Sequence, residues 1–353
     1  MNLTHRQSII FEFIKNNKNV SSGGISDYVS KKIDEVNRVT IIRDLDFLLK
    51  NNVIRKVGKG RATKYQEKID NKLLAFFDVE NYFSQDVDKR KDVKKAFNFE
   101  VFDYFNIPII SVEEKIRLDV LNVDYKKRVQ KLSPTVLKKE FERLTIELSW
   151  KSSQIEGNTY SLIDTEILIK ENKEAKKYSK EETQMILNHK KALDYIFAHK
   201  NTFKTVNLAK IEDVHKILVD NMGVKINIRN SLVGITGTNY RPLDNAFQIK
   251  EAVEKLNKYI NKKNVHPLEK ALFMIIFISY IQPFEDGNKR TGRLVGNAIL
   301  IAHGYCPLSY RSVESDEYKK AVLLFYEQNS LRYFKDLFME QFEFSVYNYF
   351  GVV

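Results

Sequence analysis

Proline interrupts helices, and this chain has only six prolines among its 353 residues. Residues 1–107 and 135–241 contain none. Through most of the chain, apolar residues recur at the spacing that places them on one face of a helix. The sequence therefore predicts a mainly α protein.

The length predicts two or three domains, at roughly 150 residues each. A single cysteine excludes an internal disulfide framework and a zinc site with several cysteine ligands. The longest apolar run, residues 271–281, is too short to span a bilayer. The first residues lack the basic and apolar pattern of a signal peptide. We therefore expect a cytoplasmic protein with no membrane partner.

The net charge of +12 is unevenly distributed. Residues 1–66 hold 13 Lys and Arg against 6 Asp and Glu, which is more than half of the excess. This asymmetry favours a polyanionic partner for the N-terminal segment. The alternative is a general richness in lysine, without a polyanion.

Residues 1–66 predict three helices followed by a hairpin that turns at Gly58–Gly60. Ser21 or Ser22 can cap the second helix. The third helix, residues 36–50, should bury Val39, Ile42, Leu45, Leu48 and Leu49.

This order resembles a winged helix-turn-helix domain. The resemblance implies DNA binding, with the third helix meeting base edges and the hairpin meeting phosphates. The residues expected at DNA are Asn37, Arg38, Thr40, Arg43, Lys59, Arg61 and Lys64. The alternative is a winged helix that serves protein contacts or dimerisation. Residues 67–140 are expected to form a helical connector.

The sequence IQPFEDGNKRTGRLVGNAIL, residues 281–300, concentrates groups that bind anions. A loop joins two predicted helices, about residues 267–280 and 291–303, and carries Lys289 and Arg290, with Arg293 one turn further on. A helix N-terminus offers free N–H groups and partial positive charge, which suits a polyphosphate. Asp286 could hold Mg²⁺ that bridges phosphate oxygens. The alternative is a structural cluster that closes a helix turn.

Residues 282–293 read Q-P-F-E-D-G-N-K-R-T-G-R and resemble the motif of the Fic (Fido) family, H-x-F-x-D/E-G-N-G-R-x-x-R. The resemblance extends over roughly residues 140–345. It implies a helical Fic core over residues 141–353, with a short β-hairpin flap at residues 228–243, beside the small winged-helix domain. Members typically transfer AMP from ATP to a Ser, Thr or Tyr hydroxyl of a protein.

The resemblance also assigns roles to residues. Phe284 would anchor the loop and Asp286 would bind Mg²⁺. The flap would align a target segment by edge-strand pairing, through Gly234, Thr236, Gly237 and Tyr240. The nucleotide phosphates would be bound by Gly287, Asn288, Lys289, Arg290, Gly292 and Arg293.

Two positions depart from the family pattern. Gln282 stands where the family has its general base, and an amide cannot accept the hydroxyl proton. Losing a general base typically costs a factor of about 10²–10⁴ in rate. Lys289 stands where the family usually has glycine, as in the related Doc toxins, which transfer the γ-phosphate.

Ser152, Glu156 and Gly157 match the family's inhibitory motif, S/T-x-x-x-E-G/N. In the family this glutamate pairs with the second arginine, here Arg293, and it can position water for AMP removal. The main hypothesis is an autoinhibited adenylyltransferase that uses ATP and Mg²⁺, acts on a target protein or on itself, and binds DNA. One alternative is a nucleotide-sensing DNA-binding regulator with little activity. Further alternatives are a Doc-like phosphotransferase and an enzyme that removes AMP. A homodimer is also possible.

Overall fold

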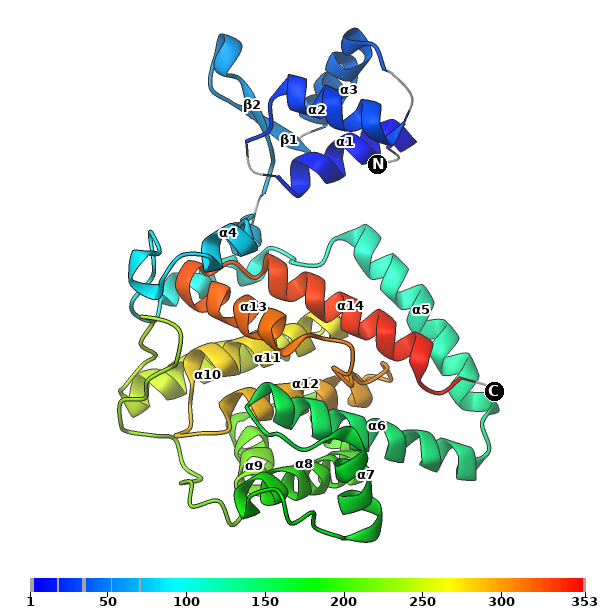
Figure 1. The fold of residues 1–353 in the computed structure, drawn as a ribbon, viewed down its shortest axis with the longest axis vertical. Coiled ribbons are helices and arrows are strands. Elements are labelled where there is room, and N and C mark those ends of the chain that lie inside the picture. The colour runs from blue at the N-terminus through cyan, green and yellow to red at the C-terminus, as the bar shows by residue number, and fades with distance from the viewer. Residues whose placement is uncertain (1–2, 18, 34–35, 52, 70, 352–353) are drawn as a thin grey trace. The chain divides into compact units, whose positions relative to one another are not determined.

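The computed structural model describes residues 3–17, 19–33, 36–51, 53–69 and 71–351 (Figure 1). The chain divides into two compact units, Met1–Arg90 and Lys91–Val353, which are considered separately. The boundary falls inside the segment predicted as a connector. Helices predominate in both units, which confirms the mainly α prediction.

The first unit begins with three helices and a hairpin. A capping box of Thr4 and Gln7 starts the first helix, and the Ser21 side chain accepts from the Gly24 N–H to start the second. The hairpin pairs Ile54 with Glu67 at its open end. These elements are α1 His5–Lys15, α2 Ser22–Lys32, α3 Arg38–Lys50, β1 Ile54–Val57, η1 Gly60–Ala62 and β2 Lys64–Glu67.

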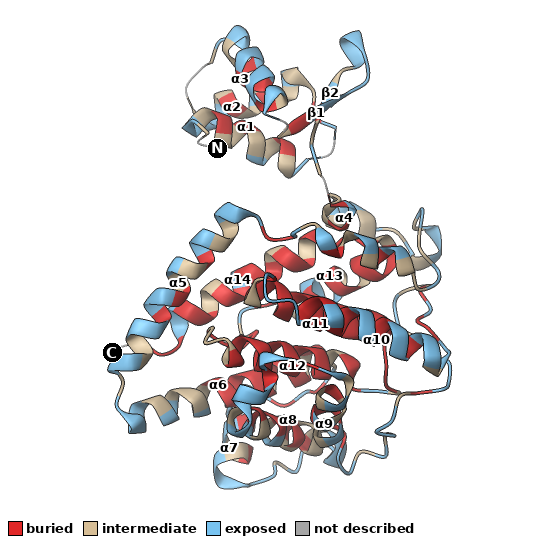
Figure 2. Cartoon of the chain, turned by 180° about the vertical axis from the view of Figure 1, so that it is seen from behind, coloured by how far each residue is buried: buried red, intermediate tan, exposed pale blue. Residues whose placement is uncertain are grey.

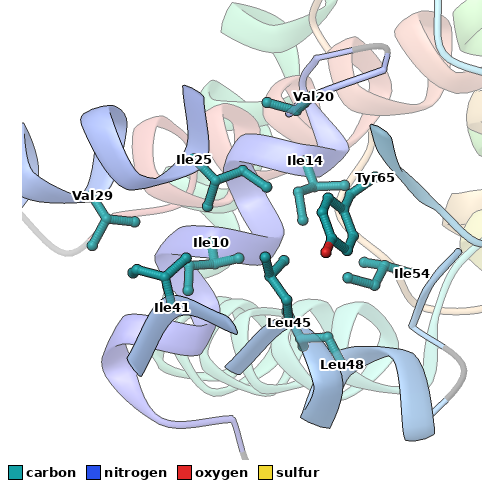
Figure 3. Close-up of a cluster of buried hydrophobic side chains, with 10 residues drawn as sticks. All are labelled: Ile10, Ile14, Val20, Ile25, Val29, Ile41, Leu45, Leu48, Ile54 and Tyr65. Carbon is teal, nitrogen blue, oxygen red and sulfur yellow. The ribbon is translucent and has the colours of Figure 1, made fainter. Parts of the chain in front are cut away.

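The helices and the hairpin share one apolar core, which Figure 3 shows in close-up. Its members are Ile10, Ile14, Val20, Ile25, Val29, Ile41, Leu45, Leu48, Ile54 and Tyr65. The predicted buried face of α3 was partly wrong, because Val39 is 54% exposed and Ile42 is 41% exposed. Ile41 packs inward instead, one position away.

A polar contact also fixes α1 to α3. The Asp44 carboxylate is buried and accepts from Arg6 Nε at 2.5 Å and from Gln7 Nε2 at 3.0 Å. Short elements complete the first unit: η2 Lys72–Leu74, α4 Val79–Phe83 and η3 Val87–Lys89.

The second unit is a helical bundle with two central helices, α11 and α12 (Figure 1). Every residue from Leu268 to Ile281 is buried, and Figure 2 shows both central helices as mostly buried. The elements in chain order are η4 Phe99–Asn106, α5 Val112–Lys131, α6 Pro134–Ile155, α7 Leu162–Glu171, α8 Lys180–Ala198, η5 Lys200–Lys204, α9 Leu208–Leu218, α10 Ala246–Ile260, α11 Pro267–Ile281, α12 Asn288–Ala302, α13 Ser315–Gln328 and α14 Arg332–Asn348.

Two glycines allow α12 to pack closely on α11. A Cβ on Gly292 would lie 2.9 Å from the Ile275 carbonyl oxygen, and a Cβ on Gly296 would lie 2.6 Å from Ile275 Cγ1. Gly292 therefore serves helix packing and lies outside the lining of the cavity described below. Helix α12 also begins at Asn288, three residues before the predicted start.

The segment predicted as a β-hairpin flap, residues 228–243, contains no strand. It runs as an irregular loop, with Arg241 in an isolated bridge to Ala96. The short antiparallel sheet of the described residues is the β1–β2 hairpin of the first unit. We call residues 228–243 the flap segment below. Among the described residues, no helix is long and apolar enough to cross a membrane.

Candidate functional site

The site is built on the loop of residues 282–287, which joins α11 to α12 and which we call the motif loop. Left-handed backbone conformations at Gln282 (φ 52°) and Gly287 (φ 79°) begin and end the turn. The Asn288 side chain bridges the loop. It accepts from the Phe284 N–H at 2.8 Å and donates to the Phe284 carbonyl at 2.9 Å. The loop is therefore held rigid before any ligand binds.

Phe284 anchors the loop from below, as the resemblance implies. Its side chain is fully buried and stacks on the His215 ring of α9, with centroids 3.7 Å apart. His215 Nε2 donates to the Asp286 carbonyl at 2.9 Å. Burial lowers the pKa of His215 to about 4, so the imidazole is neutral at pH 7. No motif in the sequence points to His215, because α9 lies far from the motif loop along the chain.

Gln282 occupies the general-base position with both ends of its amide engaged. Its Nε2 donates to the Ser279 carbonyl at 2.7 Å, and its Oε1 accepts from Asn288 at 2.8 Å. The Arg229 Nε donates to the Gln282 carbonyl at 2.6 Å. Gln282 thus lines the cavity as a fixed neutral group.

The first turns of α12 carry three cations, and two of them bind one carboxylate. Arg293 is fully buried, and its NH2 lies 2.9 Å from Glu156 Oε1. Its Nε and NH2 also donate to the Ser152 hydroxyl and carbonyl, both at 2.8 Å. Lys289 Nζ lies 3.2 Å from the other Glu156 oxygen. We call Glu156 with Arg293 and Lys289 the clamp.

Glu156 follows the last residue of α6, where Gly157 turns the chain away with φ 102°. Burial raises the pKa of Glu156, but the positive charges of Arg293 and Lys289 lower it by a larger amount. The net effect is a pKa of about 2. The carboxylate is therefore ionised throughout the physiological range. The pair of Glu156 with Arg293 was expected from the inhibitory motif, whereas the contact with Lys289 was not.

Arg290 and Asp286 pair with each other across one turn, at 3.1 Å. Arg290 is nearly fully buried, whereas the Asp286 side chain is 64% exposed. Among the described residues, no three His, Cys, Asp or Glu side chains gather as a metal site. Mg²⁺ is often held by one or two carboxylates together with substrate phosphates. The exposed Asp286 carboxylate therefore fits a Mg²⁺ that arrives with a polyphosphate.

A cavity of about 360 Å³ opens above the motif loop. Its walls come from the motif loop, the start of α12, the end of α6, α13 and the flap segment. Gly234 and Thr236 line it, as expected for the flap, and Gly237 lies against Leu323 of α13. Tyr240 is buried, and its hydroxyl donates to the Tyr280 carbonyl at 2.8 Å. Tyr240 belongs to the core, which corrects its assignment to target docking.

A second histidine lies close to the clamp. His189 of α8 is completely buried, and burial together with Arg293 and Arg290 lowers its pKa well below the ordinary value. Neither His189 nor His215 lines the cavity. Neither histidine therefore stands in for the base that Gln282 lacks.

The predicted DNA-contact residues lie in the first unit and are solvent-exposed, apart from the half-buried Thr40. They are Asn37, Arg38, Thr40 and Arg43 on and before α3, and Lys59, Arg61 and Lys64 on the hairpin. The Asn37 side chain accepts from the Val39 N–H at 2.9 Å. It therefore caps α3, a role that the DNA interpretation had not assigned to it.

Comparison with known proteins places residues 205–300 within the model of the Fic/DOC family. "Protein adenylyltransferase Fic" of Nematostella vectensis is 27% identical over 200 residues, covering 52% of this chain and 43% of the relative. The Aedes aegypti protein of the same name is 28% identical over 190 residues, covering 52% and 37%. The matched region thus spans less than half the length of these relatives.

Solved structures share the fold. A Fic domain containing signaling protein from Bacteroides thetaiotaomicron superimposes with a TM-score of 0.54 at 20% identity, covering 65% of this chain and 94% of that one. Fic-1 from C. elegans gives 0.54 at 20% identity, covering 68% and 72%. The motif loop, Phe284 and the cations of α12 lie within the region that matches the family model. Together these findings show that the chain contains a domain of the Fic family, which the family model matches over residues 205–300.

Proposed function

We propose that the chain transfers AMP from ATP to a hydroxyl of a protein, and that the clamp holds it in an inactive state. The observation that carries the proposal is the cavity above the motif loop, with the cations of α12 in its wall or beside it and Glu156 bound to two of them. The names of the curated relatives support the reaction type.

The cavity has the features that a nucleoside triphosphate requires. The N-terminus of α12 supplies free N–H groups at Asn288 and the residues after it. Lys289, Arg290 and Arg293 supply positive charge within two turns. Asp286 would hold Mg²⁺, which neutralises phosphate charge when it is bound. The exposed target hydroxyl would approach along the flap segment, past Gly234 and Thr236.

The clamp competes with the phosphates for the same cations. A phosphate that reaches Arg293 NH2 must displace Glu156, because the guanidinium is buried and this nitrogen is already bonded to Glu156 and to the Ser152 carbonyl. Displacement requires the end of α6 to move or Glu156 to change rotamer. ATP binding is therefore weakened by the free energy needed to open the clamp.

In the transfer step, the hydroxyl oxygen bonds to the α-phosphorus, pyrophosphate leaves, and the hydroxyl proton must be accepted. Gln282 cannot accept that proton. Glu156 is a weak base while its pKa is about 2, and it gains basicity only when the clamp opens. We therefore propose slow transfer in the native chain, and faster transfer when a base is restored at position 282.

One observation favours a second candidate function. Both ends of the Gln282 amide are hydrogen-bonded within the loop, which suits a residue that shapes a binding site more than one that reacts. A chain with this loop could bind ATP without transfer and regulate DNA binding. The basic and exposed surface of α3 and the hairpin supports a DNA partner for the first unit.

Radiolabelling separates these functions. Purified native chain would be incubated with Mg²⁺ and ATP carrying label on the α- or the γ-phosphate, beside Glu156→Gly, Gln282→His and the double variant. The proposal expects weak α-label transfer by the native chain and the strongest transfer by the double variant. Transfer of γ-label would indicate Doc-like phosphotransfer. ATP binding without any transfer from the native chain, together with salt-dependent DNA binding, would establish the regulator instead.

A further inference from the structure

The outward side of α5 carries a row of apolar residues that the rest of the second unit leaves exposed. Val112, Ile116, Val120 and Val123 are 67%, 61%, 58% and 49% exposed. Their spacing of four, four and three residues places them in one stripe along the helix. We call these four residues the α5 ridge. Figure 2 shows the exposed surface running along α5.

The ridge cannot turn inward, because the opposite face of α5 is fixed to the rest of the second unit. Leu118, Asn122 and Tyr125 are buried on that face. Asn122 donates to the Gly304 carbonyl at 3.2 Å and accepts from the Cys306 N–H at 3.3 Å. The orientation of the helix is therefore set, and the ridge faces outward.

Two charged residues beside the ridge, Glu113 and Lys127, are placed so that α5 complements a second copy of itself. Glu113 lies at the start of the helix and Lys127 near its end, both exposed and both without an ion pair in the described part of the chain. In a parallel pair, like charges would meet at each end. In an antiparallel pair centred on Val120, Glu113 of each copy would face Lys127 of the other. The helix dipoles would also be aligned favourably.

A contiguous apolar stripe flanked by polar residues marks an interaction site. The β-branched side chains of the ridge have few rotamers to lose, so their burial costs little conformational entropy. A two-fold interface also needs only one self-complementary surface. We propose that the α5 ridge is the interface of a homodimer, in which two copies of α5 pack antiparallel about a two-fold axis near Val120.

Sedimentation velocity of the full chain at micromolar concentration tests the proposal, because the monomer mass of 41.4 kDa is readily distinguished from twice that value. The native chain should sediment as a dimer. Ile116→Asp combined with Val120→Asp should weaken dimerisation by at least about 100-fold, since each change places a charge in the apolar interface. The matched control is Ile163→Asp, which changes a 70% exposed residue of α7 and should leave the dimer intact. A monomeric native chain, or a dimer that survives both ridge changes, would overturn the proposal.

Charge reversal and cross-linking test the antiparallel arrangement. Glu113→Lys or Lys127→Glu alone should weaken the dimer about three- to tenfold, and the double reversal should restore it. Val120→Cys should form a disulfide-linked dimer under mild oxidation, without background from Cys306, which is buried and is the single cysteine of the chain. If the Glu113→Cys variant formed a disulfide-linked dimer efficiently and the Val120→Cys variant formed none, the antiparallel geometry would be overturned.

Discussion

Glu156 and Arg293 lie 137 residues apart in the sequence, yet Glu156 Oε1 and Arg293 NH2 are 2.9 Å apart. The second Glu156 oxygen pairs with Lys289 at 3.2 Å. One carboxylate at the end of α6 thereby engages two of the three cations that begin α12. The availability of these cations to a phosphate depends on where α6 ends.

Lys289 is expected to change its role when the clamp opens. In the native chain, Lys289→Ala removes one of the two cations that hold Glu156, and ATP should bind about threefold tighter. In the Glu156→Gln background, Lys289 is no longer paired with a carboxylate and can contact the phosphates. Lys289→Ala should therefore weaken ATP binding by about threefold in that background. Calorimetric titration measures both effects. Lys225→Ala is the control, because Lys225 pairs with Glu285 of the motif loop and not with Glu156. Its effect on ATP affinity should have the same sign in both backgrounds. An effect of Lys289→Ala with one sign in both backgrounds would argue against the clamp.

The Glu156 ion pair should stabilise the fold in a defined pH range. The pKa of Glu156 is raised by burial but lowered more by Arg293 and Lys289, from 4.5 to about 2. The unfolded chain therefore takes up the proton more readily. The stabilisation is complete above about pH 4.5 and is lost as the pH falls towards 2.

Urea unfolding of the native chain and of Glu156→Gln tests this range. The variant should be less stable by about 1–3 kcal/mol at pH 7, because it leaves Arg293 buried without its partner. The difference in the free energy of unfolding should shrink below pH 4.5. Glu166→Gln, which breaks an exposed pair with Lys170, should have a small effect at every pH. A constant difference for Glu156→Gln down to pH 3 would contradict the assigned pKa.

Close packing of α12 on α11 predicts a specific cost at Gly292. Gly292→Ala places a Cβ 2.9 Å from the Ile275 carbonyl oxygen, so one helix must shift. We expect a loss of about 1–3 kcal/mol in the free energy of unfolding. Gly234→Ala is the matched control, because its Cβ would meet nothing within 4 Å. If the two substitutions lowered the free energy of unfolding equally, as measured by thermal unfolding, Gly292 would have no special role in helix packing.

DNA binding by the first unit should depend on salt through its exposed cations. Arg61→Ala and Lys64→Ala should each lower the slope of log affinity against log salt by about 1, if each contacts one phosphate. Fluorescence anisotropy with a random-sequence duplex measures this slope. Lys263→Ala, which removes an exposed cation of the second unit, serves as the control. An unchanged slope in both hairpin variants would place the DNA-binding surface elsewhere.

Much of the site could be predicted because its residues are close in sequence. The motif loop, Phe284 and the cations of α12 fall within twelve residues, and a helix N-terminus after a turn brings such groups together by local geometry. The partner of Arg293 required the resemblance to the Fic family, since nothing local connects Ser152 and Glu156 to α12.

Other features could not be predicted, because they depend on contacts between distant segments. The position of Lys289 beside Glu156, and of His215 beneath Phe284, is set by how α6 and α9 pack on α12. The buried face of α3 was ambiguous because Ile41 and Ile42 are adjacent, and both continue an apolar helical spacing. Packing against α1 and the hairpin selects Ile41.

The flap segment was misjudged for a related reason. The resemblance to the Fic family implied a hairpin there, but strands need a partner, and residues 228–243 find none beyond the bridge at Arg241. Tyr240 is then free to insert its ring beside Tyr280 of α11, with 4.8 Å between centroids. Aromatic packing in the core, rather than target docking, accounts for its position.

We propose that the cations held by Glu156 form the phosphate site. Calorimetric titration of Mg²⁺-ATP into the native chain and into Glu156→Gly tests this assignment. ATP should bind to Glu156→Gly at least about tenfold more tightly than to the native chain, and this gain should be lost when Arg293→Ala is added. Equal ATP affinity of the native chain and Glu156→Gly would contradict it.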